Sequence, residues 1–201
     1  MSFKFNLQKD EPFDLTKLDP EIPPVNFYCG VNWTPAESGA KIDLDLALIG
    51  LDGTGKMAAG QENFVYFGNR REGLGEYLEL SKDDRTGDMS EDTETGDDEY
   101  CYIRTPKTPA GVVKIAMFIT YYKSGGKTLA DVSQAGFRIC PLKDDGKPDF
   151  SKAASAIVTD IASEGMKVAE LVKTDKGWDI VMLAESSSNI EGIAKSYGVP
   201  V

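Results

Sequence analysis

The clearest strand pattern in the chain is KIDLDLALI, residues 41–49. Apolar residues recur at every second position, and a period of two is the pattern of a β-strand with one buried face. The apolar residues that share this face are Ile42, Leu44, Leu46 and Leu48. Asp43 and Asp45 share the opposite face with Ala47. The stretch therefore predicts a strand that packs on a hydrophobic core.

Two aspartates in the middle of a strand are unusual, because aspartate is depleted in strands. Two residues span about 6–7 Å along a strand, so Asp43 and Asp45 lie on one side of it at that spacing. The spacing suits two ligands that flank one cation or serve neighbouring cations. The alternative is a half-exposed strand whose outer face is acidic.

Further strand patterns follow along the chain, separated by turns that contain Gly or Pro. They lie at residues 3–9, 26–33 (with a bulge at Gly30), 64–67, 76–80, 100–104, 112–122, 134–142, 167–173 and 178–184. Residues 10–24 contain four prolines and are predicted to form an irregular connection. Residues 152–163 mix alanines with β-branched residues, so their pattern fits either a helix or a strand.

A short helix is predicted near the C-terminal end. Asn189 is suited to the N-cap position and Gly198 to the position just after the helix. The apolar residues at helical spacing between them are Ile190, Ile193, Ala194 and Tyr197. About eight to ten short strands and one helix predict an all-β protein, a two-sheet β-sandwich. We expect residues 1–201 to form a single domain.

Charge and composition narrow the functional classes. The chain has 201 residues, a hydrophobic fraction of 41% and a net charge of −11 at pH 7. Lysines and arginines are scattered, and binding to nucleic acid needs a basic patch, so we expect no nucleic acid partner. No apolar run approaches the about 18 residues of a membrane span, and no signal peptide begins the sequence. We therefore expect a cytoplasmic protein without direct membrane insertion.

The chain has no histidine and three widely spaced cysteines, Cys29, Cys101 and Cys140. Without histidine, the commonest general base and the commonest transition-metal ligand are missing. An odd number of cysteines without a CxxC motif indicates buried, reduced thiols. A carboxylate pair such as Asp97 and Asp98 is the remaining candidate for acid–base catalysis, but we expect no enzymatic activity.

The segment 80–100, LSKDDRTGDMSEDTETGDDEY, is the most acidic of the chain. Within residues 83–99, nine carboxylates accompany one basic side chain, Arg85. Such a segment either spreads its charges in water or wraps them around a cation, and hard oxygen ligands suit Ca²⁺. The segment does not fit the EF-hand pattern. Composition alone leaves both readings open.

The ordered motifs of the chain resemble those of the TerD domain of tellurium-resistance and stress proteins. In the first half they are GVNW (30–33), DLDLALIGLDGTGK (43–56) and ENFVYFGN (62–69). DDRTG (83–87) and GDDEYCYI (96–103) are similar to the calcium loop of that family. The later motifs are FRICPLKDDG (137–146), ELVKTDKGWDIVMLAE (170–185) and EGIAKSYGVPV (191–201).

This resemblance implies a β-sandwich that binds Ca²⁺ through the acidic loop and the DLD strand. The ligands that it implies are Asp43, Asp45, Asp83, Asp84, Asp97, Asp98 and Glu99, with Arg85 and Gly87 through their backbone carbonyl oxygens. The chain departs from the family pattern at Lys82 and Asp84, where the family usually has Gly and Asn. Residues 88–95 are a longer link than usual, and residues 147–165 match poorly.

The family also implies a non-enzymatic role in stress response and tellurite resistance, with other proteins of a stress-response complex as partners. The alternative function is that of a Ca²⁺-dependent lipid- or glycan-binding sandwich module. That function requires an open position on the metal and an aromatic or basic rim. Tyr66, Tyr77 and Tyr100 lie near the acidic loop in sequence and are candidates for the rim, but core packing is the use that we expect of each.

Overall fold

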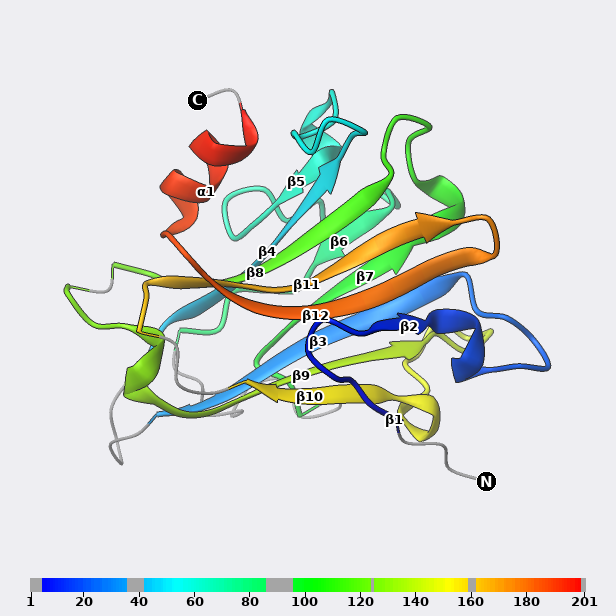
Figure 1. Cartoon of the computed structure of the whole chain (residues 1–201), viewed down its shortest axis with the longest axis horizontal. Coiled ribbons are helices and arrows are strands. Elements are labelled where there is room, and N and C mark those ends of the chain that lie inside the picture. Colours follow the sequence, from blue (N-terminus) through cyan, green and yellow to red (C-terminus); the bar gives the residue numbers. More distant parts are fainter. Residues whose placement is uncertain (1–4, 36–41, 86–95, 124, 159–161, 200–201) are drawn as a thin grey trace.

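Twelve strands form two six-stranded sheets in the computed structural model, which describes residues 5–35, 42–85, 96–123, 125–158 and 162–199 (Figure 1). Sheet A consists, from edge to edge, of β1 (Phe5–Asn6), β10 (Ala154–Val158), β9 (Val132–Pro141), β3 (Asn26–Pro35), β7 (Glu99–Arg104) and β6 (Leu78–Leu80). Sheet B consists of β2 (Pro12–Asp14), β12 (Gly177–Ser187), β11 (Gly165–Thr174), β8 (Lys114–Tyr121), β4 (Leu44–Leu51) and β5 (Phe64–Val65). The predicted β-sandwich is confirmed.

β4 is buried along its whole length and contributes to two clusters, one on each of its faces. Leu44, Leu46 and Leu48 belong to the main core, to which both sheets contribute. Ala47 and Ile49 belong to a smaller cluster on the other face of sheet B. The alternation in residues 41–49 is thus confirmed, and Asp45 lies on the same face as Ala47.

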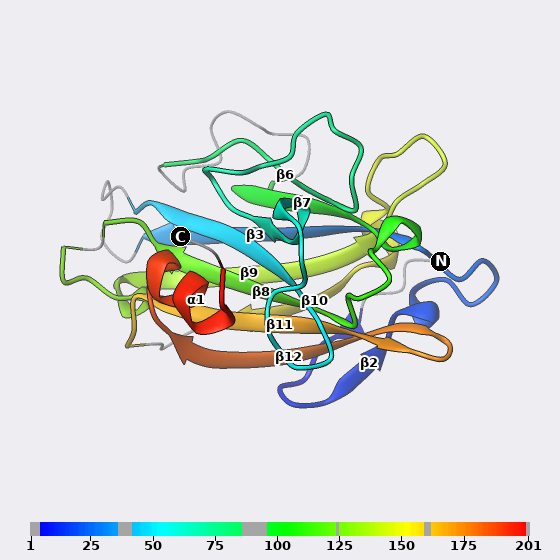
Figure 2. The ribbon, with the colours of Figure 1, turned by 90° about the horizontal axis from the view of Figure 1, so that it is seen from above.

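The helix α1 (Ile190–Tyr197) covers this second face of sheet B (Figure 2). Its N-cap is Asn189, whose side chain accepts a hydrogen bond from the backbone N–H of Gly192 at 3.1 Å. Gly198 follows it with a left-handed φ of 73°, which glycine adopts without strain. Phe118 on β8 meets Tyr197 at 5.5 Å between ring centroids. Both predicted caps are confirmed.

The proline-rich connection is more ordered than its composition predicts. β2 pairs with β12, and a 3₁₀ helix, η1 (Leu15–Leu18), follows it. Asp14 caps η1 by accepting from the N–H of Thr16 at 2.9 Å. Leu15 and Leu18 are fully buried, so this short element is anchored by two apolar side chains at helical spacing. In the ambiguous segment 152–163, residues 154–158 form the strand β10.

The predicted bulge at Gly30 is wrong, because β3 runs in regular register with β7 and β9 on either side of it. A side chain at this position would collide with a neighbour instead. A Cβ added to Gly30 would lie 2.0 Å from Oδ2 of Asp97. Glycine is therefore required here for close approach rather than for a bend.

The three cysteines are buried free thiols, as predicted. Burial raises the pKa of Cys101 and of Cys140 to about 12, so neither is a thiolate at neutral pH. Within the described part of the chain, no helix has the length and hydropathy that crossing a bilayer requires.

Candidate metal centre

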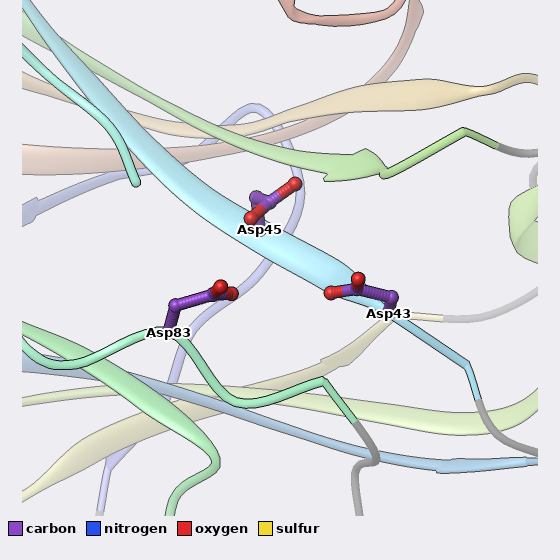
Figure 3. Close-up of side chains that lie close together, drawn as sticks. All are labelled: Asp43, Asp45 and Asp83. Atoms are coloured by element: carbon purple, nitrogen blue, oxygen red, sulfur yellow. The ribbon is translucent and has the colours of Figure 1, made fainter. Parts of the chain in front are cut away.

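Three aspartates from two distant parts of the chain point toward one another (Figure 3). Asp43 immediately precedes β4, Asp45 lies within it, and Asp83 follows β6. One carboxylate oxygen of each lies within 4.8 Å of the others. We call these residues the aspartate triad. The sequence predicts all three as ligands, and the structure brings them together.

The pairing of β6 with β7 carries Asp83 to the triad. The N–H of Ser81 continues the ladder beyond β6 by donating to the carbonyl oxygen of Tyr100 at 2.8 Å. The next residues therefore run beside the start of β7. On the other side, β5 pairs with β4 at Leu48 and Ile49, beyond the end that carries Asp45. Asp83 thus approaches the part of β4 that β5 does not cover.

Each aspartate of the triad carries a buried oxygen that lacks a hydrogen-bond partner in the part of the chain that the structure describes. Among the described residues, such atoms include Oδ1 of Asp43, Oδ2 of Asp45 and Oδ1 of Asp83. Thr120 is the cross-strand neighbour of Asp45 on β8, and its buried hydroxyl also has no hydrogen-bond partner among the described residues. Buried polar groups are nearly always paired, so four unpaired oxygens in one region call for an explanation.

Burial and mutual repulsion raise the pKa values of two carboxyl groups of the triad, those of Asp43 and Asp45. Burial, together with the negative charge of Asp83, raises the pKa of Asp43 to about 6, and the positive charge of Arg85 opposes this shift. Burial and the charges of Asp43 and Asp83 raise the pKa of Asp45 to about 7. A divalent cation among the carboxylates would replace this repulsion by attraction.

The triad fits Ca²⁺ in size and chemistry. Ca²⁺ binds carboxylate oxygens at about 2.3–2.6 Å, so two of its ligands are at most about 5 Å apart. The 4.8 Å span of the triad is within that limit. Three carboxylates provide up to six oxygens, and Ca²⁺ accepts about 6–8, so positions remain for other ligands.

Asp97 and Asp98 interact with other partners. The Asp97 carboxylate lies on the outer face of sheet A, where it accepts from the hydroxyl of Tyr28 at 2.6 Å and from Nε of Arg138 at 2.7 Å. Asp98 accepts from the backbone N–H of Trp33 at 2.7 Å. The family resemblance implies both as ligands, and the hydrogen bonds described for them join residues 97–98 to β3 and β9.

The remaining predicted ligands border the triad or lie outside the described residues. Glu99 accepts backbone hydrogen bonds from Leu46 and Asp84, and burial raises its pKa well above the ordinary value. Asp84 is half-buried. Arg85 forms an ion pair with Asp83, with 3.0 Å between Nε and Oδ2, and its side chain is 77% exposed. Gly87 and residues 88–95 lie outside the described residues.

A cavity of about 270 Å³ opens from the triad. Besides the three aspartates it is lined by Phe67, Arg85, Tyr122 and Lys123. The rings of Phe67 and Tyr122 meet edge to face at 5.4 Å, and Nζ of Lys123 lies 5.0 Å from the centroid of Tyr122.

The three tyrosines weighed as rim candidates from the sequence do not line this cavity, and the core packing expected of them holds for Tyr77. Tyr77 is buried and donates to Asn63, Tyr66 stacks on Phe64, and Tyr100 stacks on Tyr28. The signal for Tyr122 is its place just after β8, where its N–H donates to the carbonyl oxygen of Asp43 at 2.9 Å. Only the strand register reveals that contact.

Known proteins similar to this chain include two from Bacillus subtilis (strain 168). General stress protein 16U is 29% identical over 206 residues, which cover 98% of each chain. The uncharacterized protein YceE is 25% identical over 205 residues, with 97% of this chain and 98% of YceE covered.

Solved structures show the same fold. The crystal structure of a homologue of telluride resistance protein (TerD) from Streptomyces coelicolor A3(2) superposes with a TM-score of 0.58 at 17% identity. The match covers 83% of this chain and 92% of the homologue. The TerD domain matches residues 3–197 of this chain, nearly its whole length. The chain therefore belongs to the TerD domain family.

Proposed function

We propose that this protein is a non-enzymatic Ca²⁺-binding member of the TerD family that acts in stress response. The observation that carries the proposal is the set of unpaired buried oxygens on Asp43, Asp45 and Asp83. Each is a hard ligand without a protein donor among the described residues, and Ca²⁺ prefers such oxygens. The name of General stress protein 16U supports the stress-response part of the proposal.

In this proposal Ca²⁺ cross-links the segment that begins at Asp83 to sheet B. Asp43 and Asp45 are fixed by β4, whereas Asp83 lies in a segment outside the strands. A cation shared by all three holds that segment against the sheet and shapes a surface for other proteins of a stress-response complex. The lack of histidine in the sequence supports a non-enzymatic role.

Thermal unfolding tests the metal part of the proposal. Ca²⁺ that binds only the folded state stabilises it by about 2.7 kcal/mol at a hundredfold excess over Kd. We therefore expect Ca²⁺ to raise the Tm of the unmutated protein and Mg²⁺ to raise it less. In Asp83→Asn we expect the rise with Ca²⁺ to be lost. Asp175→Asn, which removes an exposed carboxylate from the turn between β11 and β12, is the matched control and retains the rise. An equal response of the two variants contradicts the proposal.

Limited proteolysis tests the cross-link. Ca²⁺ is expected to protect the segment after Asp83 in the unmutated protein and in Asp175→Asn, but not in Asp83→Asn. Protection that does not depend on Ca²⁺ would show that the metal does not hold this segment.

The cavity over the triad favours a second candidate function, Ca²⁺-dependent binding of lipid headgroups or glycans. The cavity is lined by the triad and by Phe67, Tyr122 and Lys123, so aromatic and basic groups lie beside the carboxylates. Vesicle and glycan binding assays with and without Ca²⁺ test this function. Binding that requires Ca²⁺ and is lost in Tyr122→Ala supports it, and absence of binding in both conditions rejects it.

A further inference from the structure

The side chain of Glu99 connects the two sheets beside the aspartate triad. Glu99 is the first residue of β7 in sheet A and is 1% exposed. Its Oε2 accepts a hydrogen bond from the backbone N–H of Leu46, on β4 of sheet B, at 2.6 Å. Its Oε1 accepts from the backbone N–H of Asp84 at 3.4 Å. One carboxylate therefore contacts two backbone segments that the fold brings together from different sheets.

These two segments carry two members of the triad. Leu46 directly follows Asp45, and Asp84 directly follows Asp83. A buried backbone N–H requires an acceptor, and at Leu46 the acceptor is Glu99 rather than a neighbouring strand. The short hydrogen bond to Leu46 thus ties Glu99 to β4, and the longer one to Asp84 links it to the segment that carries Asp83.

We propose that Glu99 is a positioning residue of the metal centre. It holds β4 and the segment after β6 at the separation at which Asp45 and Asp83 share one cation. This inference rests on the proposed Ca²⁺ function, and it gives Glu99 a role different from the direct ligation that the family resemblance implies. Because each carboxylate oxygen keeps a second lone pair, the test must separate positioning from ligation.

Amide hydrogen exchange on the metal-free protein tests the contacts themselves. In Glu99→Ala, the amides of Leu46 and Asp84 lose their acceptor, and we expect the Leu46 amide to exchange about tenfold faster or more. In Glu99→Gln the side chain keeps one acceptor oxygen, so one amide retains its protection. Glu185→Gln, at an exposed position of β12, is the charge-matched control and leaves both rates unchanged. Unchanged rates in Glu99→Ala overturn the inference.

Terbium luminescence separates positioning from ligation, with Tb³⁺ in place of Ca²⁺. Decay rates in H₂O and D₂O give the number of water molecules on the bound ion. For Glu99→Gln we expect affinity about tenfold weaker and an unchanged water number, because the ligands remain but are held less firmly. Asp83→Asn removes a direct ligand and is expected to add bound water.

The outcomes are distinguishable. An added water in Glu99→Gln shows that Glu99 is a ligand and overturns the positioning role. Unchanged affinity in Glu99→Gln, with circular dichroism showing a folded variant, also overturns it. If the unmutated protein binds neither Ca²⁺ nor Tb³⁺, the proposed function fails, and the positioning role fails with it. Weaker binding with unchanged hydration supports both.

Discussion

Asp45 on β4 lies directly opposite Thr120 on β8, and each carries a buried oxygen that has no hydrogen-bond partner among the described residues. Thr120 is 1% exposed and Asp45 is 2% exposed. Cross-strand neighbours have side chains on the same face of the sheet, so the two groups border the same space. This pair, together with the half-buried Asp43 and Asp83, forms a polar region that is suited to a cation.

Replacing the hydroxyl of Thr120 by a methyl group tests whether it is unpaired in the metal-free protein. A buried polar group without a partner costs about 1–3 kcal/mol, so Thr120→Val is expected to stabilise the metal-free protein by about 1 kcal/mol. Urea unfolding in the presence of a chelator measures this change. Thr120→Ser keeps the hydroxyl and serves as the control, in which we expect no increase in the free energy of unfolding. A loss of stability in Thr120→Val would show that the hydroxyl is bonded.

The stability of the metal-free protein is expected to fall with rising pH on account of the triad. The pKa values of Asp43, about 6, and Asp45, about 7, are above the ordinary value of 3.8, so the folded state holds these protons more tightly than the unfolded state. Their contribution to stability is fully present below pH 3.8 and is lost as the pH rises through 6 to 7. Unfolding curves between pH 4 and pH 8 measure it.

Asp45→Asn imitates the protonated carboxyl group and is the informative variant for this pH effect. It is expected to flatten the fall in stability and to be more stable than the unmutated protein at pH 8 without metal. Saturating Ca²⁺ is expected to abolish the decrease in stability with rising pH in the unmutated protein, because the cation favours the charged carboxylates. A pH profile that is the same for Asp45→Asn and the unmutated protein contradicts the prediction.

Asp97→Asn is expected to affect stability rather than metal binding. The substitution breaks the ion pair between the buried Asp97 and the partly exposed Arg138 and weakens the hydrogen bond from Tyr28, at a cost of about 2–3 kcal/mol. The Kd for Ca²⁺ is expected to change by less than about threefold, or about 0.7 kcal/mol. Chemical unfolding and Ca²⁺ titration of the same preparation measure the two effects. A large loss of affinity would make Asp97 a ligand, as the family resemblance implies.

Removing the N-cap of α1 is expected to weaken the helix without affecting the triad. In Asn189→Ala, the backbone N–H of Gly192 loses its acceptor, which costs about 1 kcal/mol. Asn189→Ser retains a capping oxygen and is expected to remain close to the unmutated protein. Thermal unfolding compares the two variants, and equal Tm values would show that the cap contributes nothing.

The features predicted correctly from the sequence are those with a local cause. The period of two in residues 41–49 gives the two faces of β4, and the residue types at Asn189 and Gly198 mark the ends of α1. The sequence pattern does not reveal the burial of Leu15 and Leu18, because the prolines around this short helical turn are typical of an irregular connection. Gly30 was misjudged because its constraint comes from Asp97, far away in the sequence.

The candidate site was only partly predictable for the same reason. Asp97, Asp98 and Glu99 are consecutive acids that composition cannot distinguish, yet they contact the outer face of sheet A, the backbone of β3 and the backbone of β4 respectively. Which partner each acid meets depends on the pairing of β7 with β3 and on the packing of the two sheets. The rim residues Phe67 and Tyr122 are likewise brought together only by the tertiary fold.

Calorimetric titration of the chelator-treated protein with Ca²⁺ measures whether the aspartate triad is a calcium site. We expect saturable binding to the unmutated protein and to Asp175→Asn, and loss of binding in Asp43→Asn and in Asp45→Asn. Asp97→Asn is expected to retain binding. Absence of heat at millimolar Ca²⁺, or undiminished binding when Asp43 and Asp45 are both replaced, would contradict the claim that the aspartate triad is a calcium site.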